Sequence, residues 1–130
     1  MAEHTVGEVI PELRVTPDKY LPHRYAGASG DFNPIHIDEE FAKAVGLPRN
    51  ILHGLYSMGL VARASAALAD GDPKALKKLT VQFRGMGLPE QEIVVSGKVA
   101  AAEGDRVTVD VEAVQGEQKI VKNAQAELRL

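Results

Sequence analysis

In the C-terminal half of the chain, apolar residues recur at every second position, as in strands that bury one face. Turn-rich segments at 85–91, 103–105 and 115–117 interrupt this alternation. The pattern predicts four strands, at 79–84, 93–101, 107–114 and 119–130. Consecutive strands joined by short turns usually pair with one another, so the last three are expected to form an antiparallel meander.

In the N-terminal half, apolar residues are spaced three and four apart, which predicts helices. One short helix is expected from residue 21 to about 28, capped by Asp18. A second is expected over 39–45, where Asp38 provides the cap and Gly46 the stop. Apolar residues around Pro11, within 9–16, favour a short edge strand.

The longest helical pattern covers residues 54–69, and Ala, Gly and Ser occupy most of its circumference. A helix with so few charges is expected to be enclosed on several sides, most simply by a sheet that wraps around it. The chain is therefore predicted to be one α+β domain, residues 1–130, with a curved antiparallel sheet around a long central helix. The open edge of such a sheet predicts a dimer.

Composition narrows the possible functions. The formal charge is only -3 and the 15 Lys and Arg residues are scattered, which argues against a nucleic-acid partner or a polybasic membrane patch. The absence of Cys excludes disulfides and thiolate chemistry and fits a reducing cytoplasm. No signal-peptide pattern begins the sequence, and the apolar stretch 55–69 is shorter than the roughly 20 residues that span a bilayer.

The segment from Ser29 to His36 carries the first candidate chemistry. Asp31 and His36 are five residues apart, and Pro34 stiffens the backbone between them by fixing its own φ and extending Asn33. A carboxylate and an imidazole held on a rigid turn can position a water molecule and transfer its protons near neutral pH. Asp, Asn, Pro and Gly are also ordinary turn residues, so a purely structural turn remains open from residue types alone.

The second candidate is the start of the long helix, at Leu52-His53-Gly54. Unpaired backbone N–H groups and the positive end of the helix dipole favour an oxygen that gains negative charge, and Gly54 allows close approach to the backbone. A thioester carbonyl bound there would be polarised toward an enolate. A glycine chosen for packing is the alternative, and His53 receives no catalytic role.

The run from Tyr25 to His36, with Ser29-Gly-Asp31-Phe-Asn33-Pro-Ile-His36 at its centre, resembles the signature of the (R)-specific enoyl-CoA hydratases, the MaoC-like dehydratases. Ala42 and the Leu-His-Gly54 motif match as well, so the resemblance covers at least residues 18–69. It implies the hot-dog fold, in which a sheet wraps one long helix. It also favours a catalytic role for Asp31 and His36 over a purely structural turn.

The resemblance also implies roles. Asp31 and His36 bind the catalytic water, Asn33 supports them, and the Gly54 N–H binds the thioester carbonyl. Asp31 is then the base and His36 the acid, although two groups that share one water titrate as a pair, which leaves that division open. Syn hydration would give the (R)-3-hydroxyacyl thioester. The substrate is an acyl-CoA or acyl carrier protein thioester, and neither a cofactor nor a metal is expected.

One departure from the family lies after the first strand of the C-terminal half. Members often carry a Pro-Val-x-Pro-Gly-Asp-like turn where this chain has the segment 84–91, which leaves that loop's contacts uncertain. Lys77, Lys78 and Arg84 are candidates for the phosphates of coenzyme A, with solvated strand charges as the alternative.

Several functions remain open within this fold. A homodimeric hydratase of fatty-acid oxidation or polyester precursor supply is the first. A catalytic subunit of a heterodimeric elongation dehydratase, paired with a homologue that lacks the dyad, is the second. An acyl-CoA thioesterase is the third, but the central helix offers no Asp or Glu before Asp70 to serve it. A non-catalytic acyl-thioester-binding subunit would have no need for both proton-transfer residues.

Overall fold

The computed structural model describes residues 4–130. The helices are α1 Leu21–Ser29, α2 Pro34–Ile37, α3 Glu39–Ala44 and α4 Gly54–Ala66, followed by the 3-10 turns η1 Ala67–Ala69 and η2 Pro73–Ala75. The strands are β1 Leu13–Val15, β2 Leu76–Phe83, β3 Ile93–Glu103, β4 Arg106–Gln115 and β5 Gln118–Arg129. They form one antiparallel sheet in the order β1-β3-β4-β5-β2.

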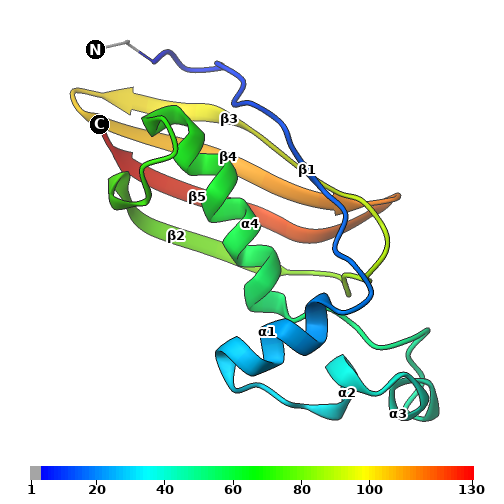
Figure 1. Ribbon diagram of the computed structural model, residues 1–130. Coiled ribbons are helices and arrows are strands. Elements are labelled where there is room, and N and C mark those ends of the chain that lie inside the picture. Colours follow the sequence, from blue (N-terminus) through cyan, green and yellow to red (C-terminus); the bar gives the residue numbers. More distant parts are fainter. Residues whose placement is uncertain (1–3) are drawn as a thin grey trace.

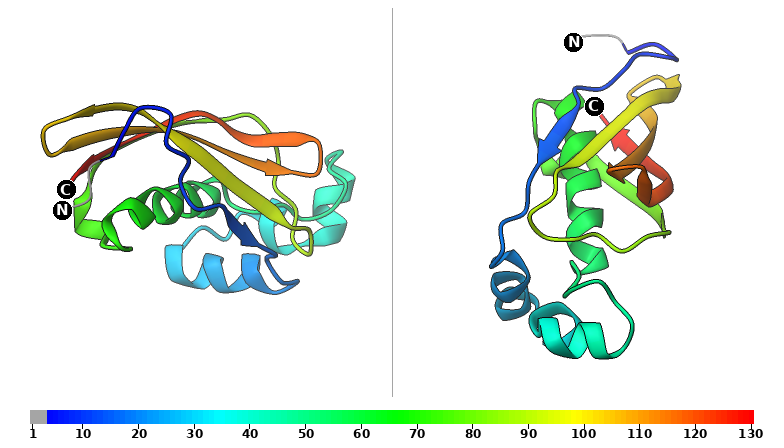
Figure 2. Two further views of the ribbon diagram at one scale, coloured as in Figure 1. Left: turned by 90° about the horizontal axis from the view of Figure 1, so that it is seen from above. Right: turned by 90° about the vertical axis from the view of Figure 1, so that its right-hand side faces the viewer.

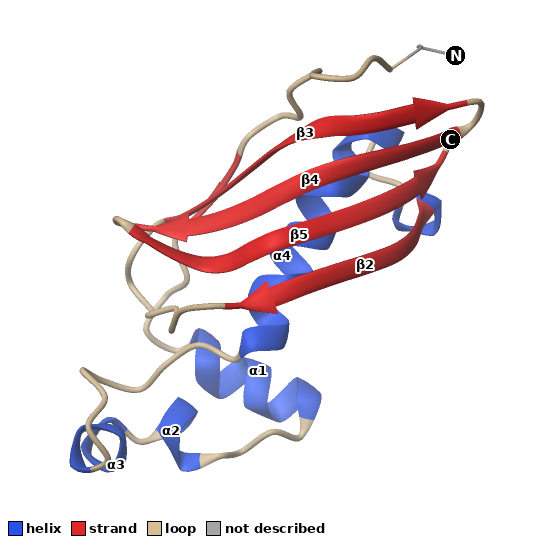
Figure 3. Cartoon of the chain, turned by 180° about the vertical axis from the view of Figure 1, so that it is seen from behind, coloured by secondary structure: helices blue, strands red, loops and turns tan. Residues whose placement is uncertain are grey.

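The sheet curves over α4, which lies along its concave face (Figure 2, left). Seen from behind, β3, β4, β5 and β2 lie side by side and cover α4 (Figure 3). The short helices α1, α2 and α3 gather beyond the N-terminal end of α4 (Figure 1). The predicted α+β class, a hot-dog arrangement with a curved sheet around a long helix, is confirmed, as is the β3-β4-β5 meander.

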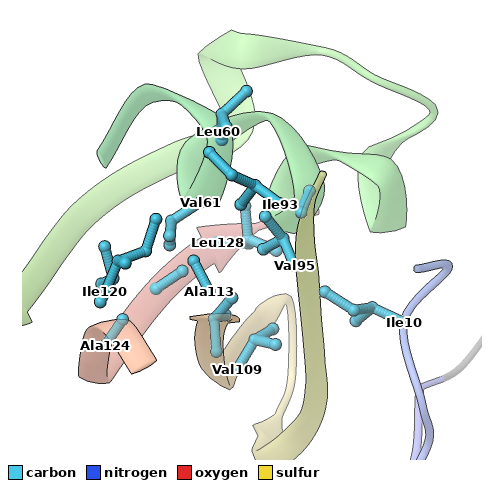
Figure 4. Packing of buried hydrophobic residues seen from close by; sticks show 14 of the residues in the cluster. Ile10, Leu60, Val61, Ile93, Val95, Val109, Ala113, Ile120, Ala124 and Leu128 are labelled. Atoms are coloured by element: carbon cyan, nitrogen blue, oxygen red, sulfur yellow. The ribbon is translucent and has the colours of Figure 1, made fainter. Parts of the chain in front are cut away.

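The core lies between α4 and the sheet (Figure 4). Every second residue of β4 faces it, and Val107, Val109, Val111 and Ala113 are all buried. Val61 of α4 is fully buried against these residues. The small side chains of α4 allow the helix to pack close to the sheet, and burial of each valine contributes about 1.5–3 kcal/mol.

Three N-terminal details differ from the sequence predictions. Asp18 does not cap α1, because Tyr20 occupies the N-cap position and the Asp18 carboxylate accepts a hydrogen bond from the Tyr20 N–H at 2.8 Å. The unpredicted helix α2 begins at Pro34, whose missing N–H is no loss at a helix start. The predicted edge strand around Pro11 shortens to β1, with one further bridge between Val9 and Lys98.

The other helices and strands lie close to their predicted positions. Asp38 caps α3 through its carboxylate, which accepts from the Phe41 N–H at 3.1 Å, and Gly46 follows with a φ of 95°. The α-helical part of the central helix ends at Ala66, and a 3-10 turn completes the predicted span. Strand β2 begins at Leu76, three residues before the predicted start.

The central helix is less enclosed than predicted. Its sheet side is buried, but Leu55, Gly59 and Arg63 form an exposed stripe on the opposite side, and Leu55 is 63% exposed. A single chain therefore covers one side of α4 only. No helix among residues 4–130 combines the length and apolar composition needed to cross a bilayer. From the sequence, no signal peptide is expected at the N-terminus, and residues 1–3 of that segment lie outside the described residues.

Two glycines test how tightly the sheet is packed. A Cβ added at Gly97 of β3 would overlap the carbonyl oxygen of Asp110 in the neighbouring strand, whereas one at Gly27 of α1 would meet nothing within 4 Å. We expect Gly97→Ala to lower the free energy of unfolding by about 1–3 kcal/mol in urea titrations. Gly27→Ala, the matched control, should raise it by about 0.5–1 kcal/mol. Equal effects would contradict this packing.

Candidate active site

The turn from Ser29 to Asn33 is held by its own hydrogen bonds. The Ser29 hydroxyl accepts from the Asp31 N–H at 3.1 Å, and the Asp31 carboxylate accepts from the Asn33 N–H at 3.2 Å. Asn33 has the extended ψ of 127° expected before a proline, and its side-chain oxygen caps α2 by accepting from the Ile35 N–H. Asn33 therefore supports Asp31 through its backbone.

The imidazole of His36 faces the Asp31 carboxylate from a buried position. Its Nδ1 lies 2.8 Å from the carbonyl oxygen of Ile51, and since a carbonyl only accepts, Nδ1 carries the hydrogen. In the neutral ring, Nε2 is then a free acceptor, and it lies 3.7 Å from Asp31 Oδ2. At that separation the two atoms do not share a direct hydrogen bond, but both can bond one water molecule.

A second segment, residues 50–52, fixes His36 in this orientation. The buried Asn50 donates its side-chain amide to the carbonyl oxygen of His36 at 2.9 Å. The Ile51 N–H donates to Ile35 at 2.9 Å, while its carbonyl receives the imidazole. Neither Asn50 nor Ile51 was predicted from the sequence, because their contacts with α2 are tertiary and leave no periodic signal.

Gly54 is the first residue of α4, and no side chain caps that helix. The preceding residue, His53, stacks on His36 with ring centroids 3.9 Å apart, so Gly54 directly follows a residue that contacts the dyad. A Cβ at Gly54 would come within 3.3 Å of the Phe83 ring. The absent side chain keeps the backbone open at a helix start, where the dipole favours an anionic oxygen.

Asp31, His36 and His53 also form the kind of cluster that can hold a metal, with one potential ligand atom from each within 4.8 Å of the others. However, the two imidazole rings are stacked with centroids 3.9 Å apart and planes that differ by only 21°, so their in-plane lone pairs lie in separate, nearly parallel planes. Zinc and similar ions need lone pairs that converge on one point. This arrangement suits proton transfer better than metal binding.

The loop that departs from the family pattern contacts the site. The carbonyl oxygen of Gly87 accepts from the Leu52 N–H at 2.8 Å, so the loop buttresses the segment that leads into α4. The loop is held in turn by the buried Gln115 of β4, which exchanges hydrogen bonds with the backbone of Leu88 and donates to Gln91. The different sequence therefore still supports the helix start.

The three candidate phosphate-binding charges lie at different distances from the site. Arg84 follows Phe83, whose ring meets Gly54, and its side chain donates to Gln82. Lys78 and Lys77 lie five and six residues before Phe83 on β2. They are roughly 16–20 Å farther along the strand. Only Arg84 borders the dyad end of the helix.

The structure thus brings together all four residues predicted from sequence, Asp31, Asn33, His36 and Gly54, and adds Asn50, Ile51 and His53. Comparison with known proteins agrees with the fold and motif. The family described as "MaoC like domain" matches residues 4–121. The chain belongs to this MaoC-like family.

The relatives include catalytic proteins longer than this chain. Peroxisomal enoyl-CoA hydratase 2 of Arabidopsis thaliana is 39% identical over 84 residues, which cover 64% of this chain and 26% of that protein. This chain thus spans about a quarter of that relative's length. A solved MaoC-like dehydratase superimposes with a TM-score of 0.91 at 32% identity, over 97% of this chain and 40% of the other.

A structure of more similar length comes from the ChsH1-ChsH2 complex of Mycobacterium tuberculosis. It matches with a TM-score of 0.86 at 28% identity and covers 97% of this chain and 98% of the other. The full fold described above, including the helices around the dyad, is therefore shared with an experimentally determined protein chain.

Proposed function

We propose that this chain is an (R)-specific enoyl-thioester hydratase, which adds water reversibly and syn across the double bond of a trans-2-enoyl thioester. The observation that carries the proposal is the 3.7 Å approach of Asp31 Oδ2 to His36 Nε2, the ring nitrogen that does not bond Ile51, beside the uncapped start of α4. Family membership and the enoyl-CoA hydratase name of the Arabidopsis relative support it.

In the proposed reaction, Asp31 and His36 hold one water while the Gly54 N–H binds the thioester carbonyl oxygen. Asp31 takes a proton from the water, the oxygen bonds to the β-carbon, and the π electrons move onto the carbonyl oxygen. The helix start stabilises this enolate. His36 acts in its protonated form, in which Nε2 carries a hydrogen as well as Nδ1. It gives the Nε2 proton to the α-carbon, and the proton gained by Asp31 then returns to Nε2. Each step reverses for dehydration.

Delivery of water and proton from one side of the substrate explains syn addition, because both groups border the same water position. The (R) configuration follows from which face of the alkene is presented, as in the family that the chain resembles. An acyl-CoA is the favoured carrier, and acyl carrier protein is the alternative. Thioester hydrolysis is disfavoured because α4 carries no carboxylate.

The reaction is tested with crotonyl-CoA by following the loss of enoyl absorbance and the release of free thiol together. We expect hydration without thiol release, and chiral analysis should give the (R)-3-hydroxy product. Asp31→Asn and His36→Ala should each lower turnover by roughly 10²- to 10⁴-fold, the range for acid-base groups.

Asp105→Asn, a matched change in the β3–β4 turn far from α1–α3, should leave the rate unchanged. Circular dichroism would establish that all variants are folded. Thiol release without hydration, or near-normal rates in both dyad variants, would contradict the proposal.

We infer further that the chain works as an oligomer, either with itself or with a homologous subunit. Leu55 at the start of α4 and Phe83 at the end of the edge strand β2 are 63% and 49% exposed. Large apolar side chains clustered beside a free strand edge favour burial in an interface. The neighbour of similar length, taken from a complex of two different chains, supports the paired alternative.

Light scattering of the purified chain distinguishes these assemblies. A homodimer should have a mass near 28 kDa, twice the 14.0 kDa of the single chain. A stable, active 14 kDa species would contradict any oligomer. A 14 kDa species that is inactive until a dyad-lacking homologue is added would favour the heterodimer.

A further inference from the structure

His53 is a buried polar residue that the proposed proton transfers do not use. Only 2% of it is exposed, although it stands at the N-cap position of α4, where polar side chains usually bond the first helical N–H groups. It makes no such bond. Burying an imidazole without a capping role carries a desolvation cost, so its contacts must be sought elsewhere.

The ring of His53 contacts both members of the dyad. Its Nε2 lies 3.0 Å from the backbone carbonyl oxygen of Asp31, so Nε2 carries the hydrogen and donates it. One face of the ring stacks on His36, at 3.9 Å between centroids. Tyr25 packs on the same ring at 4.6 Å and 43°. A single side chain thus bonds the turn that carries one catalytic group and stacks against the other.

The second ring nitrogen of His53, Nδ1, forms no comparable contact within the described part of the chain. Nδ1 is buried and has no hydrogen-bond partner among residues 4–130. With Nε2–H donated to Asp31, the neutral ring leaves Nδ1 as an unpaired acceptor. A buried acceptor without a partner is destabilising, and a buried aromatic residue of similar shape without ring nitrogens would avoid that cost. His53 is thus buried with one nitrogen unpaired, while its other nitrogen forms the hydrogen bond to the Asp31 carbonyl oxygen.

We propose that His53 is a positioning residue for the reaction proposed above: it ties the Asp31 turn to the start of α4 and sets the plane of the His36 imidazole. The covalent bond at Cγ and the hydrogen bond from Nδ1 to the Ile51 carbonyl hold the His36 ring at two points, which leaves it free to tilt about the line between them. The stacked His53 ring blocks that tilt. Tyr25, whose other neighbour is Tyr56, holds His53 from its side.

Three substitutions separate the two contacts. His53→Gln keeps a donor near the Nε2 position and loses the ring, whereas His53→Phe keeps the ring and loses the donor. His53→Ala loses both. We expect kcat with crotonyl-CoA to fall about 10²-fold in His53→Ala and about tenfold in each single-contact variant, while KM changes less than threefold. His23→Gln, at an exposed histidine on α1, should retain the wild-type rate.

A spectroscopic readout distinguishes failure of this inference from failure of the hydratase proposal. The His36 Nδ1–H, bonded to Ile51, should give an NMR signal protected from exchange in the wild type. It should exchange at least tenfold faster in His53→Ala than in His53→Phe, whatever substrate the protein uses. If the His36 Nδ1–H exchanged as slowly in His53→Ala as in the wild type, or if the variants changed KM alone and kept kcat, the positioning role would be overturned. Crotonyl-CoA inactivity with the predicted exchange pattern would overturn only the hydratase proposal.

Discussion

The hydrogen bond from His36 Nδ1 to the carbonyl oxygen of Ile51 is the interaction on which the site depends. It fixes the tautomer of the imidazole, and it leaves Nε2 as the atom that meets Asp31. It exists because residues 50–52 run between α2 and the loop after β2, bound to Ile35 on one side and Gly87 on the other. The fold thus places a peptide carbonyl where a side chain would be less rigid.

The large-scale architecture serves this local geometry. The small side chains of α4 let the sheet close over one side of the helix, and the first turn of α4 remains open at the end where α1 and α2 gather. A larger residue at Gly54 would press on Phe83 and cover the backbone. Small residues therefore serve α4 in two ways: they let the sheet pack closely against the helix, and they leave its first N–H group uncovered.

The sequence predicts this fold well where the signal is periodic. The alternating valines of β4 and the small residues of α4 define their buried faces without reference to any partner. The residue types alone left an ordinary turn open, and the Asp31, Asn33, His36 and Gly54 site was predicted because its residues lie in short motifs that resemble a known family signature. Asn50 and His53 were not, since each acts through a backbone carbonyl that only tertiary folding brings near. The exposed stripe on α4 was likewise unpredicted, because the small residues around the helix do not distinguish the side that the sheet covers from the side that it leaves open.

The central claim is that Asp31 and His36 act as one unit on one water, and a double-mutant cycle tests it most directly. The ratio kcat/KM for crotonyl-CoA hydration would be measured for the wild type, Asp31→Asn, His36→Ala and the double variant. Residues that act as a unit are non-additive, so the double variant should lie within about threefold of the slower single variant. Losses that multiply, so that the double variant falls by the product of the two single losses, would contradict the account.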